Sequence, residues 1–310
     1  MIASGPVPPA LYGLLKRFFD VPKRVVLIGH PVIQSLSSAL HQTALDEVGI
    51  DARYEPLDVP LISLAETIEA LRGDDYLGAN ITVPYKERVA PMVDRLTDEA
   101  QATGAVDTIT REGPRLIGHN TDVIGFRAAL DNLIGRQKMP KNAVIIGAGG
   151  GARAAVYTLI TNAFQRVIVF NRHLHRAEGL IRHFGRSASH MELRAMPWHE
   201  SVIEAELAKT KVLINASAVS DAAATSPIPA ELLAPDLLVL DLMFWPAETR
   251  LMRDARAAGA AEVQNGDMML LHQTAAAFNL WTGRDIPLDT LQRRLDDARN
   301  TPAADVVTAG

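Results

Sequence analysis

The sequence contains no cysteine among its 310 residues. Disulfides, thiolate zinc sites, iron–sulfur clusters and cysteine nucleophiles are therefore excluded, and a reducing compartment is favoured. Basic residues are in the minority, because 31 Lys and Arg stand against 36 Asp and Glu and give a net charge of −5. A protein that binds nucleic acid through its backbone is usually basic, so the charge argues against a nucleic-acid partner.

Long apolar segments are also missing. No uninterrupted run reaches the ~18 apolar residues that a membrane-spanning helix needs. The first residues lack the basic start and continuous apolar stretch of a signal peptide, so we expect none. The nine histidines are scattered, without an H-E-x-x-H pattern, and no metal site is expected. These absences favour a cytoplasmic protein that binds neither membrane nor nucleic acid.

The remaining composition is that of a globular protein, with 48% hydrophobic and 22% charged residues. Its length suggests about two domains, and alternating strand and helix patterns predict an α/β fold with parallel sheets. The predicted strands cover 24–28, 54–59, 80–83, 106–110, 116–118, 143–146, 167–170, 212–215 and 237–242, with 106–110 and 116–118 forming a hairpin. The predicted helices cover 39–48, 62–71, 125–133, 151–162, 176–183, 248–258 and 268–281. The small, polar residues 301–310 predict a flexible tail.

A glycine-rich turn follows the predicted strand at 143–146 and precedes a predicted helix. It reads G-x-G-x-x-A, with Gly147, Gly149 and Ala152 at the fixed positions. Gly147 permits a tight turn, Gly149 lets the backbone approach a pyrophosphate, and Ala152 allows close packing of helix on strand. The motif alone is weak, because such turns also join ordinary strands and helices. The strand–turn–helix context favours binding of a dinucleotide.

The next predicted strand of this region ends at Asn171 without the acidic residue that holds the ribose 2′-hydroxyl of NAD. Arg172 and Arg176 stand there instead. A guanidinium presents a planar set of donors that suits a 2′-phosphate, so the sequence favours NADP and makes NAD less likely. The alternative is that both arginines are solvated at the start of a helix.

Three short polar segments stand out in the first half of the chain. Ser35 and Ser37 lie between a predicted strand and helix, where hydroxyls and free helix N–H groups suit a carboxylate. Asn80 and Thr82 share one face of a strand, and Lys86 lies just past its end. The third segment, Asn120-Thr121-Asp122, follows the predicted hairpin. Taken singly, each has a simpler explanation, since Ser37 and Asp122 suit helix caps and a lone lysine is usually a surface residue.

Four motifs together resemble the shikimate dehydrogenase family: NITVPYKE at 80–87, GAVDTIT at 104–110, HNTDVIGF at 119–126 and GAGGGARAA at 147–155. The resemblance extends from Gly29 to Gly283. It implies an α/β fold with a substrate-binding catalytic domain over 1–124, completed by C-terminal helices over 266–300. A Rossmann-type NADP-binding domain over 125–265 is implied as well, with a cleft between the two. A homodimer is the oligomeric state expected from the family.

The family reduces 3-dehydroshikimate reversibly to shikimate with NADPH, in the biosynthesis of aromatic amino acids. The resemblance implies that Lys86 and Asp122 form the catalytic pair, and that Ser35 and Ser37 bind the substrate carboxylate. The other implied substrate-binding residues are Asn80, Thr82, Asp107, Asp122 and Gln273. The implied cofactor-binding residues are Gly147, Ala148, Gly149, Gly150, Gly151, Ala152, Asn171, Arg172, Arg176, Ala216, Ser217 and Met269. The charge of Asp122 raises the pKa of Lys86 and burial lowers it, and the sequence leaves open which effect is larger.

Five positions depart from the family pattern. Asp107 stands where Asn is usual, Ser38 where Pro is usual, and Val123 where Gly is usual; Phe244 replaces Tyr and Met268 replaces Gly. A carboxylate at 107 is expected to be protonated, to raise the pKa of Lys86, or to accept a cationic group of the substrate. Two alternatives therefore stay open: a paralogue acting on quinate or aminoshikimate, and a ligand-binding regulator that has lost turnover.

Overall fold

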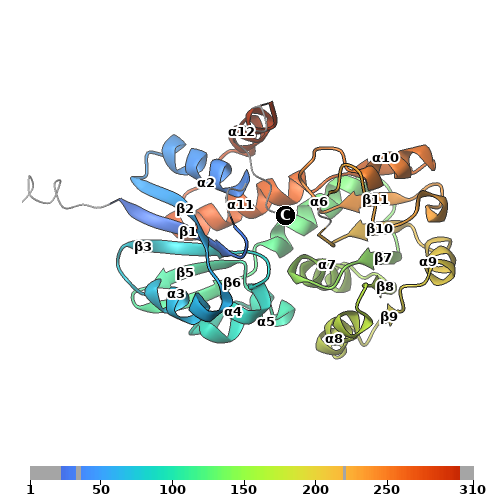
Figure 1. Cartoon of the computed structure of the whole chain (residues 1–310), viewed down its shortest axis with the longest axis horizontal. Helices are drawn as coiled ribbons and strands as arrows, with labels where there is room; N and C mark the ends of the chain where they lie inside the picture. Colours follow the sequence, from blue (N-terminus) through green and yellow to red (C-terminus); the bar gives the residue numbers. More distant parts are fainter. Residues whose placement is uncertain (1–21, 33–35, 219–220, 301–310) are drawn as a thin grey trace, which may run out of the picture.

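The computed structural model describes residues 22–32, 36–218 and 221–300. The expectations for Ser35 and for the tail at 301–310 lie outside these residues. The described chain forms two lobes side by side, each built around a six-stranded sheet (Figure 1). The mixed α/β class predicted from the sequence is confirmed.

The sheet of the first lobe has the strand order β2-β1-β3-β5-β6-β4. Strands β1, β2 and β3 are parallel, whereas β5 runs antiparallel to both β3 and β6, so the sheet is mixed. The predicted hairpin is confirmed as β5–β6, although the prediction placed its first strand two residues too early. The bounds are β1 Lys23–Gly29, β2 Ala52–Asp58, β3 Tyr76–Ile81, β4 Arg95–Leu96, β5 Thr108–Glu112 and β6 Arg115–His119.

Both faces of this sheet are buried. In β1, Val25 and Leu27 face one core, and Val26 and Ile28 face the other, as the two-residue period of a strand requires. One core lies under α2 (Leu36–Glu47), α11 (Asp267–Thr282) and α12 (Leu288–Asn300). The other core is covered by α3 (Leu64–Ala70), which follows the exposed turn η1 (Leu61–Ser63), and by α4 (Lys86–Val89), η2 (Ala90–Met92) and α5 (Asp98–Thr103).

The sheet of the second lobe is parallel throughout, with the order β12-β11-β10-β7-β8-β9. This is the strand order of a dinucleotide-binding fold, in which successive strands are added first on one side of the first strand, β7, and then on its other side. The bounds are β7 Asn142–Ile146, β8 Arg166–Phe170, β9 Glu192–Met196, β10 Val212–Asn215, β11 Leu238–Asp241 and β12 Glu262–Gln264.

Helices cover both faces of the second sheet. α6 (Asp122–Ile134), α7 (Gly150–Thr161) and α8 (Leu174–Phe184) pack on one face. The other face carries α9 (Glu200–Leu207), η3 (Ala230–Leu232) and α10 (Arg250–Ala257).

Two helices, α6 and α11, lie between the lobes (Figure 1). They cross closely at Gly125, where a Cβ atom would stand 2.4 Å from the carbonyl oxygen of Met269, so only glycine fits. α6 begins in the first lobe at Asp122, and its apolar side chains enter the core of the second lobe. The expected division between residues 124 and 125 therefore falls within this helix. The close crossing gives Asp122 and Met269 fixed positions where the lobes meet.

Candidate active site

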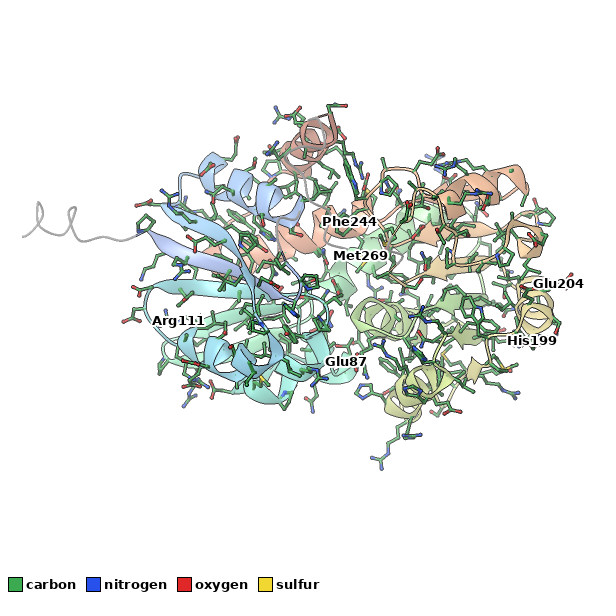
Figure 2. All side chains as sticks on the ribbon, viewed as in Figure 1. Glu87, Arg111, His199, Glu204, Phe244 and Met269 are labelled. Atoms are coloured by element: carbon green, nitrogen blue, oxygen red, sulfur yellow. The ribbon has the colours of Figure 1, made fainter. Side chains whose placement is uncertain are left out.

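A cleft of about 790 Å³ lies between the lobes, at the carboxyl ends of strands β3, β10 and β11. Ligands of α/β proteins gather at such strand ends. Residues of both lobes and of α11 line the cleft, and Phe244 and Met269 lie between the lobes (Figure 2). The lining contains these residues singled out from the sequence: Ser37, Asn80, Thr82, Lys86, Asp107, Asp122, Gly151, Ala216, Ser217, Met269 and Gln273.

Lys86 and Asp122 meet at the floor of this cleft. The Nζ atom of Lys86 donates a hydrogen bond to Oδ2 of Asp122 over 2.6 Å. The carboxylate side chain is 1% exposed and that of the lysine 18%, so the ion pair is largely removed from water. Lys86 begins α4 just after β3, and Asp122 begins α6 just after β6. Two strand ends of the first sheet therefore bring the pair together.

The pKa values of the pair follow from burial and from a third charge. Burial lowers the pKa of Lys86, but the charges of Asp122 and Asp107 and the hydrogen bond to Asp122 outweigh it, so the pKa is raised. Burial also raises the pKa of Asp122, and the charge of Asp107 adds to this rise while Lys86 opposes it. The question that the sequence left open for Lys86 is thus decided by the two carboxylates.

One oxygen of the Asp122 carboxylate has no hydrogen-bond partner among the described residues. This atom, Oδ1, is buried, and Oγ1 of Thr274 on α11 is likewise buried without a partner among these residues. Both residues line the cleft. A buried polar atom without a partner is costly, so these two atoms require polar groups from a ligand or from water. The cleft therefore contains two polar atoms that can form hydrogen bonds to a ligand.

Asn80 is engaged by its neighbours in the first lobe. Its Oδ1 accepts a hydrogen bond from the hydroxyl of Tyr54 over 2.8 Å. Its Nδ2 donates to the carbonyl oxygen of Asp107 and to Oγ1 of Thr108. Asn80 thus has both amide hydrogens in use and presents its remaining acceptor capacity to a ligand.

The glycine-rich turn adopts the backbone that its residues predict. Gly147 has a φ of +111°, and a Cβ there would stand 2.7 Å from the carbonyl oxygen of Ala216. Gly149 precedes α7 and has open space where a Cβ would be. Ala152 is fully buried. The turn therefore leaves room for an anionic group at the N-terminus of α7, where helix N–H groups are free.

The two arginines expected to bind a 2′-phosphate are exposed just past the end of β8. Neither Arg172 nor Arg176 forms an ion pair within the part of the chain that the structure describes. Asn171 holds the turn by donating from Nδ2 to the carbonyl oxygen of His173. Because the guanidinium groups are unpaired, they are available to a phosphate.

An aromatic cluster that no sequence motif indicated lies beside the cleft. His41 stacks on Tyr54 with ring centroids 4.6 Å apart, and Trp281 lies 5.1 Å from His41. His41 lines the cleft, and burial lowers its pKa to about 3. It follows Ser37 by one helical turn of α2, a spacing that could have pointed to it.

Two of the five departures from the family pattern have different surroundings. Phe244 lines the cleft, and its carbonyl oxygen accepts a hydrogen bond from Arg299 of α12, which also pairs with Asp267. Met268 packs against the core of the second lobe and is absent from the lining. Met268 is therefore not among the side chains that narrow the cleft.

No cluster of three or more His, Asp or Glu side chains with the geometry of a metal site occurs in the described ranges. No helix of the described chain has the length and apolar character that crossing a membrane requires.

Three family models match the sequence in order. The shikimate dehydrogenase substrate binding domain matches residues 27–109, and shikimate / quinate 5-dehydrogenase matches 132–239. The shikimate 5′-dehydrogenase C-terminal domain matches residues 269–295. The three matches cover both lobes and the helix α11 between them.

Curated relatives and solved structures agree with these models. The chain is 37% identical to the shikimate dehydrogenase (NADP(+)) of Salinibacter ruber, over 85% of this chain and 93% of the relative. It is 36% identical to that of Symbiobacterium thermophilum, over 87% and 93%. The crystal structure of shikimate 5-dehydrogenase from Thermus thermophilus with NADP(H) and shikimate matches with a TM-score of 0.76 and 36% identity, covering 89% of this chain and 99% of that one. Quinate dehydrogenase from Corynebacterium glutamicum with NAD gives a TM-score of 0.79 at 27% identity, over 89% and 99%. The chain belongs to the shikimate dehydrogenase family.

Proposed function

We propose that this protein is an NADP-dependent shikimate dehydrogenase, which reversibly reduces 3-dehydroshikimate to shikimate in aromatic amino-acid biosynthesis. The observation that carries the proposal is the Lys86–Asp122 pair, joined over 2.6 Å in a cleft that faces the glycine-rich turn. The relatives with 36–37% identity are named for this activity, and a neighbouring structure holds both ligands. The quinate dehydrogenase neighbour shares only 27% of its sequence with this chain.

The second lobe fits the cofactor. The cradle at Gly149 accepts a pyrophosphate at the N-terminus of α7, and Arg172 and Arg176 offer unpaired guanidinium groups for a 2′-phosphate. NADPH supplies the hydride when it is bound. The proposed cofactor-binding residues are Gly147, Ala148, Gly149, Gly150, Gly151, Ala152, Asn171, Arg172, Arg176, Ala216, Ser217 and Met269.

The first lobe handles the proton and the substrate. As a keto oxygen gains negative charge, the Lys86 ammonium stabilises that charge and donates its proton. Asp122 binds the ammonium through Oδ2, and its unpartnered Oδ1 accepts a hydrogen bond from a ring hydroxyl. In the reverse direction Lys86 receives the proton from the hydroxyl. The other proposed substrate contacts are Ser35 and Ser37 for the carboxylate, and Asn80, Thr82, Asp107 and Gln273 for the ring.

The proposal extends to the organisation of the chain. Residues 1–124 and 266–300 form the substrate-binding catalytic domain, and residues 125–265 form the NADP-binding domain. Support comes from the two sheets, which have separate cores, and from α11, which packs on both. A homodimer in the cytoplasm remains the state expected from the family, and sedimentation of the purified protein tests the dimer.

The deciding experiment is a matrix of steady-state assays. Shikimate, quinate and aminoshikimate are each offered with NADP and with NAD, and formation of reduced cofactor is followed by absorbance. We expect shikimate with NADP to give the highest kcat/KM. A higher value for quinate or aminoshikimate contradicts the proposed substrate. Tight binding of shikimate without any change in absorbance identifies a regulator instead of an enzyme.

A further inference from the structure

Asp107 is the most densely hydrogen-bonded carboxylate near the catalytic pair. Its side chain is buried, in the turn between α5 and β5. Oδ1 accepts hydrogen bonds from the backbone N–H of Thr121, from Oγ1 of Thr121 and from Oγ1 of Thr108, each over 2.8 Å. Oδ2 accepts one from the backbone N–H of Asp122 over 2.6 Å. The carboxylate is thus hydrogen-bonded to both residues at which α6 begins.

These hydrogen bonds replace a local helix cap. Thr121 occupies the N-cap position of α6, but its own side chain makes no capping hydrogen bond. Asp107 satisfies the N–H groups of Thr121 and Asp122 from another segment, and a negative charge there is stabilised by the helix N-terminus. An asparagine could accept from only one of the two N–H groups, because its second terminal atom is a donor. A carboxylate is therefore the side chain that holds both.

The position of the catalytic carboxylate depends on this contact. Asp122 is the first residue of α6, and its Oδ2 meets Lys86 over 2.6 Å. Because Asp107 binds the backbone N–H of Asp122, it fixes the origin from which that side chain reaches the ammonium. A displacement of about 1 Å at a catalytic group can cost ~10²-fold in rate.

We propose that Asp107 is a positioning residue for proton transfer: its carboxylate anchors the start of α6 so that Asp122 meets Lys86. This inference rests on the proposed function. It assigns Asp107 a role toward Asp122 and Lys86 that does not require contact with the substrate.

The charged groups around Lys86 determine the pH at which this lysine loses its proton. Asp122 of α6 pairs with the ammonium directly, and the charge of Asp107 acts on it from the turn before β5. The neighbouring carboxylate of Glu87 is paired over 2.8 Å with Arg153 of α7. The N-terminus of α7 approaches the lysine at Gly150, where a Cβ would stand 2.8 Å from Cδ of Lys86. Of the three carboxylates Asp122, Glu87 and Asp107, only Asp107 forms neither a hydrogen bond to Lys86 nor an ion pair with another cationic side chain among the described residues.

The test measures the reductive reaction of Asp107→Asn across alkaline pH. Reduction requires protonated Lys86, so the rate falls as the pH rises through the pKa of that lysine. Removing the charge of Asp107 disfavours the ammonium, and we expect the midpoint of this fall to move down by about one pH unit. At neutral pH we expect kcat to drop by about tenfold, with the KM for NADPH unchanged, because Asp122 loses its anchor.

Asp221→Asn is the matched control, since Asp221 also lines the cleft, is exposed, and loses the same charge. Its pH midpoint should equal that of the unmodified enzyme. Thr108→Val keeps the charge and removes one donor to Oδ1, so it should lower kcat without moving the midpoint, and it serves if Asp107→Asn does not fold.

An unchanged midpoint and kcat in a folded Asp107→Asn enzyme overturn the proposal, as does an equal shift in Asp221→Asn. If Asp107→Asn does not fold, a Thr108→Val enzyme identical to the unmodified one overturns it. Absence of turnover by the unmodified enzyme with shikimate contradicts the proposed function instead.

Discussion

At the scale of single residues, we propose that cofactor choice depends on the unpaired guanidinium groups of Arg172 and Arg176. Arg172 stands where an acidic residue would bind the 2′-hydroxyl of NAD, and no ion pair competes for it within the described ranges. We expect Arg172→Ala to raise the KM for NADP by about tenfold and to change the KM for NAD little, because only NADP carries the phosphate. Arg182 is exposed on α8, and Arg182→Ala is the control. Equal losses with the two cofactors would show that the phosphate is read elsewhere.

A second prediction at this scale concerns stability and pH. Buried His41 has a pKa of about 3, well below the ordinary value of 6.5. The unfolded chain therefore binds a proton below pH 6.5 that the folded chain does not bind until pH 3. Stability from this residue is present above pH 6.5 and is lost as the pH falls, by about 2 kcal/mol at pH 5.

The measurement compares urea unfolding at pH 7 and pH 5 for the unmodified protein and for His41→Phe, which keeps a ring against Tyr54. The variant should lose about 2 kcal/mol less between the two values of pH. His190→Phe, at an exposed position, should behave as the unmodified protein does. The same pH dependence in all three proteins would contradict the assignment to His41.

At the scale of elements, the sequence predicted what its apolar patterns encode. The strands β7, β8, β10 and β11 are apolar runs, and each was predicted within one residue of its bounds. By contrast, β9 and α9 were missed, because both are short and charged residues interrupt their apolar pattern. These two elements are ordered by packing on the sheet, in which β9 is an edge strand. β3 begins at Tyr76, four residues before its prediction, since Gly78 interrupts the apolar pattern. Gly78 is required there, because a Cβ would collide with Ile109 and Trp281.

The residues that line the cleft were predicted only where a short motif contains them. Motifs gave Lys86, Asp122 and the glycine-rich turn, because each carries its chemistry in a few consecutive residues. The hydrogen bonds of Asp107 to the start of α6 and the stacking of His41 on Tyr54 join segments far apart in sequence. No local pattern records such a contact, so these roles required the structure.

The turn before α7 supplies the prediction at this scale. Gly150 packs against the stem of Lys86, whereas Gly149 has open space at its Cβ position. We expect Gly150→Ala to push the lysine from Asp122 and to lower kcat by about tenfold or more. Gly149→Ala should instead raise the KM for NADP, because its methyl group occupies the cradle for the pyrophosphate. The opposite assignment of the two effects, by steady-state kinetics, would contradict the proposed roles.

At the scale of the whole molecule, two links of different kinds join the lobes. α6 and α11 connect them through the chain and through close packing at Gly125. The second link consists of side chains at the other side of the cleft, where Glu87 lies between the lobes (Figure 2). His183 of α8 contacts the carbonyl oxygen of Ala102 over 2.8 Å, and Arg153 of α7 reaches α4 and α5. We expect the first link to persist when the lobes move, and the second to form only when the cleft is as narrow as it is here.

We therefore expect Arg153 to influence how closely the lobes approach. Its guanidinium donates to Glu87 over 2.8 Å and to the carbonyl oxygen of Thr103 over 2.9 Å, and its side chain is only 12% exposed. Without it, the buried contact between the lobes loses two charge-assisted hydrogen bonds, so Arg153→Ala should favour a wider cleft. We expect a larger radius of gyration in small-angle X-ray scattering and a several-fold higher KM for both ligands, because closing the cleft then consumes part of their binding energy. Arg127→Ala is the matched control, since that arginine joins only α6 to the end of α7. If saturating ligands restore the same radius in Arg153→Ala as in the unmodified enzyme, the contact acts on closure; an unaltered radius and KM in the free variant would mean that packing of α6 and α11 alone holds the lobes together.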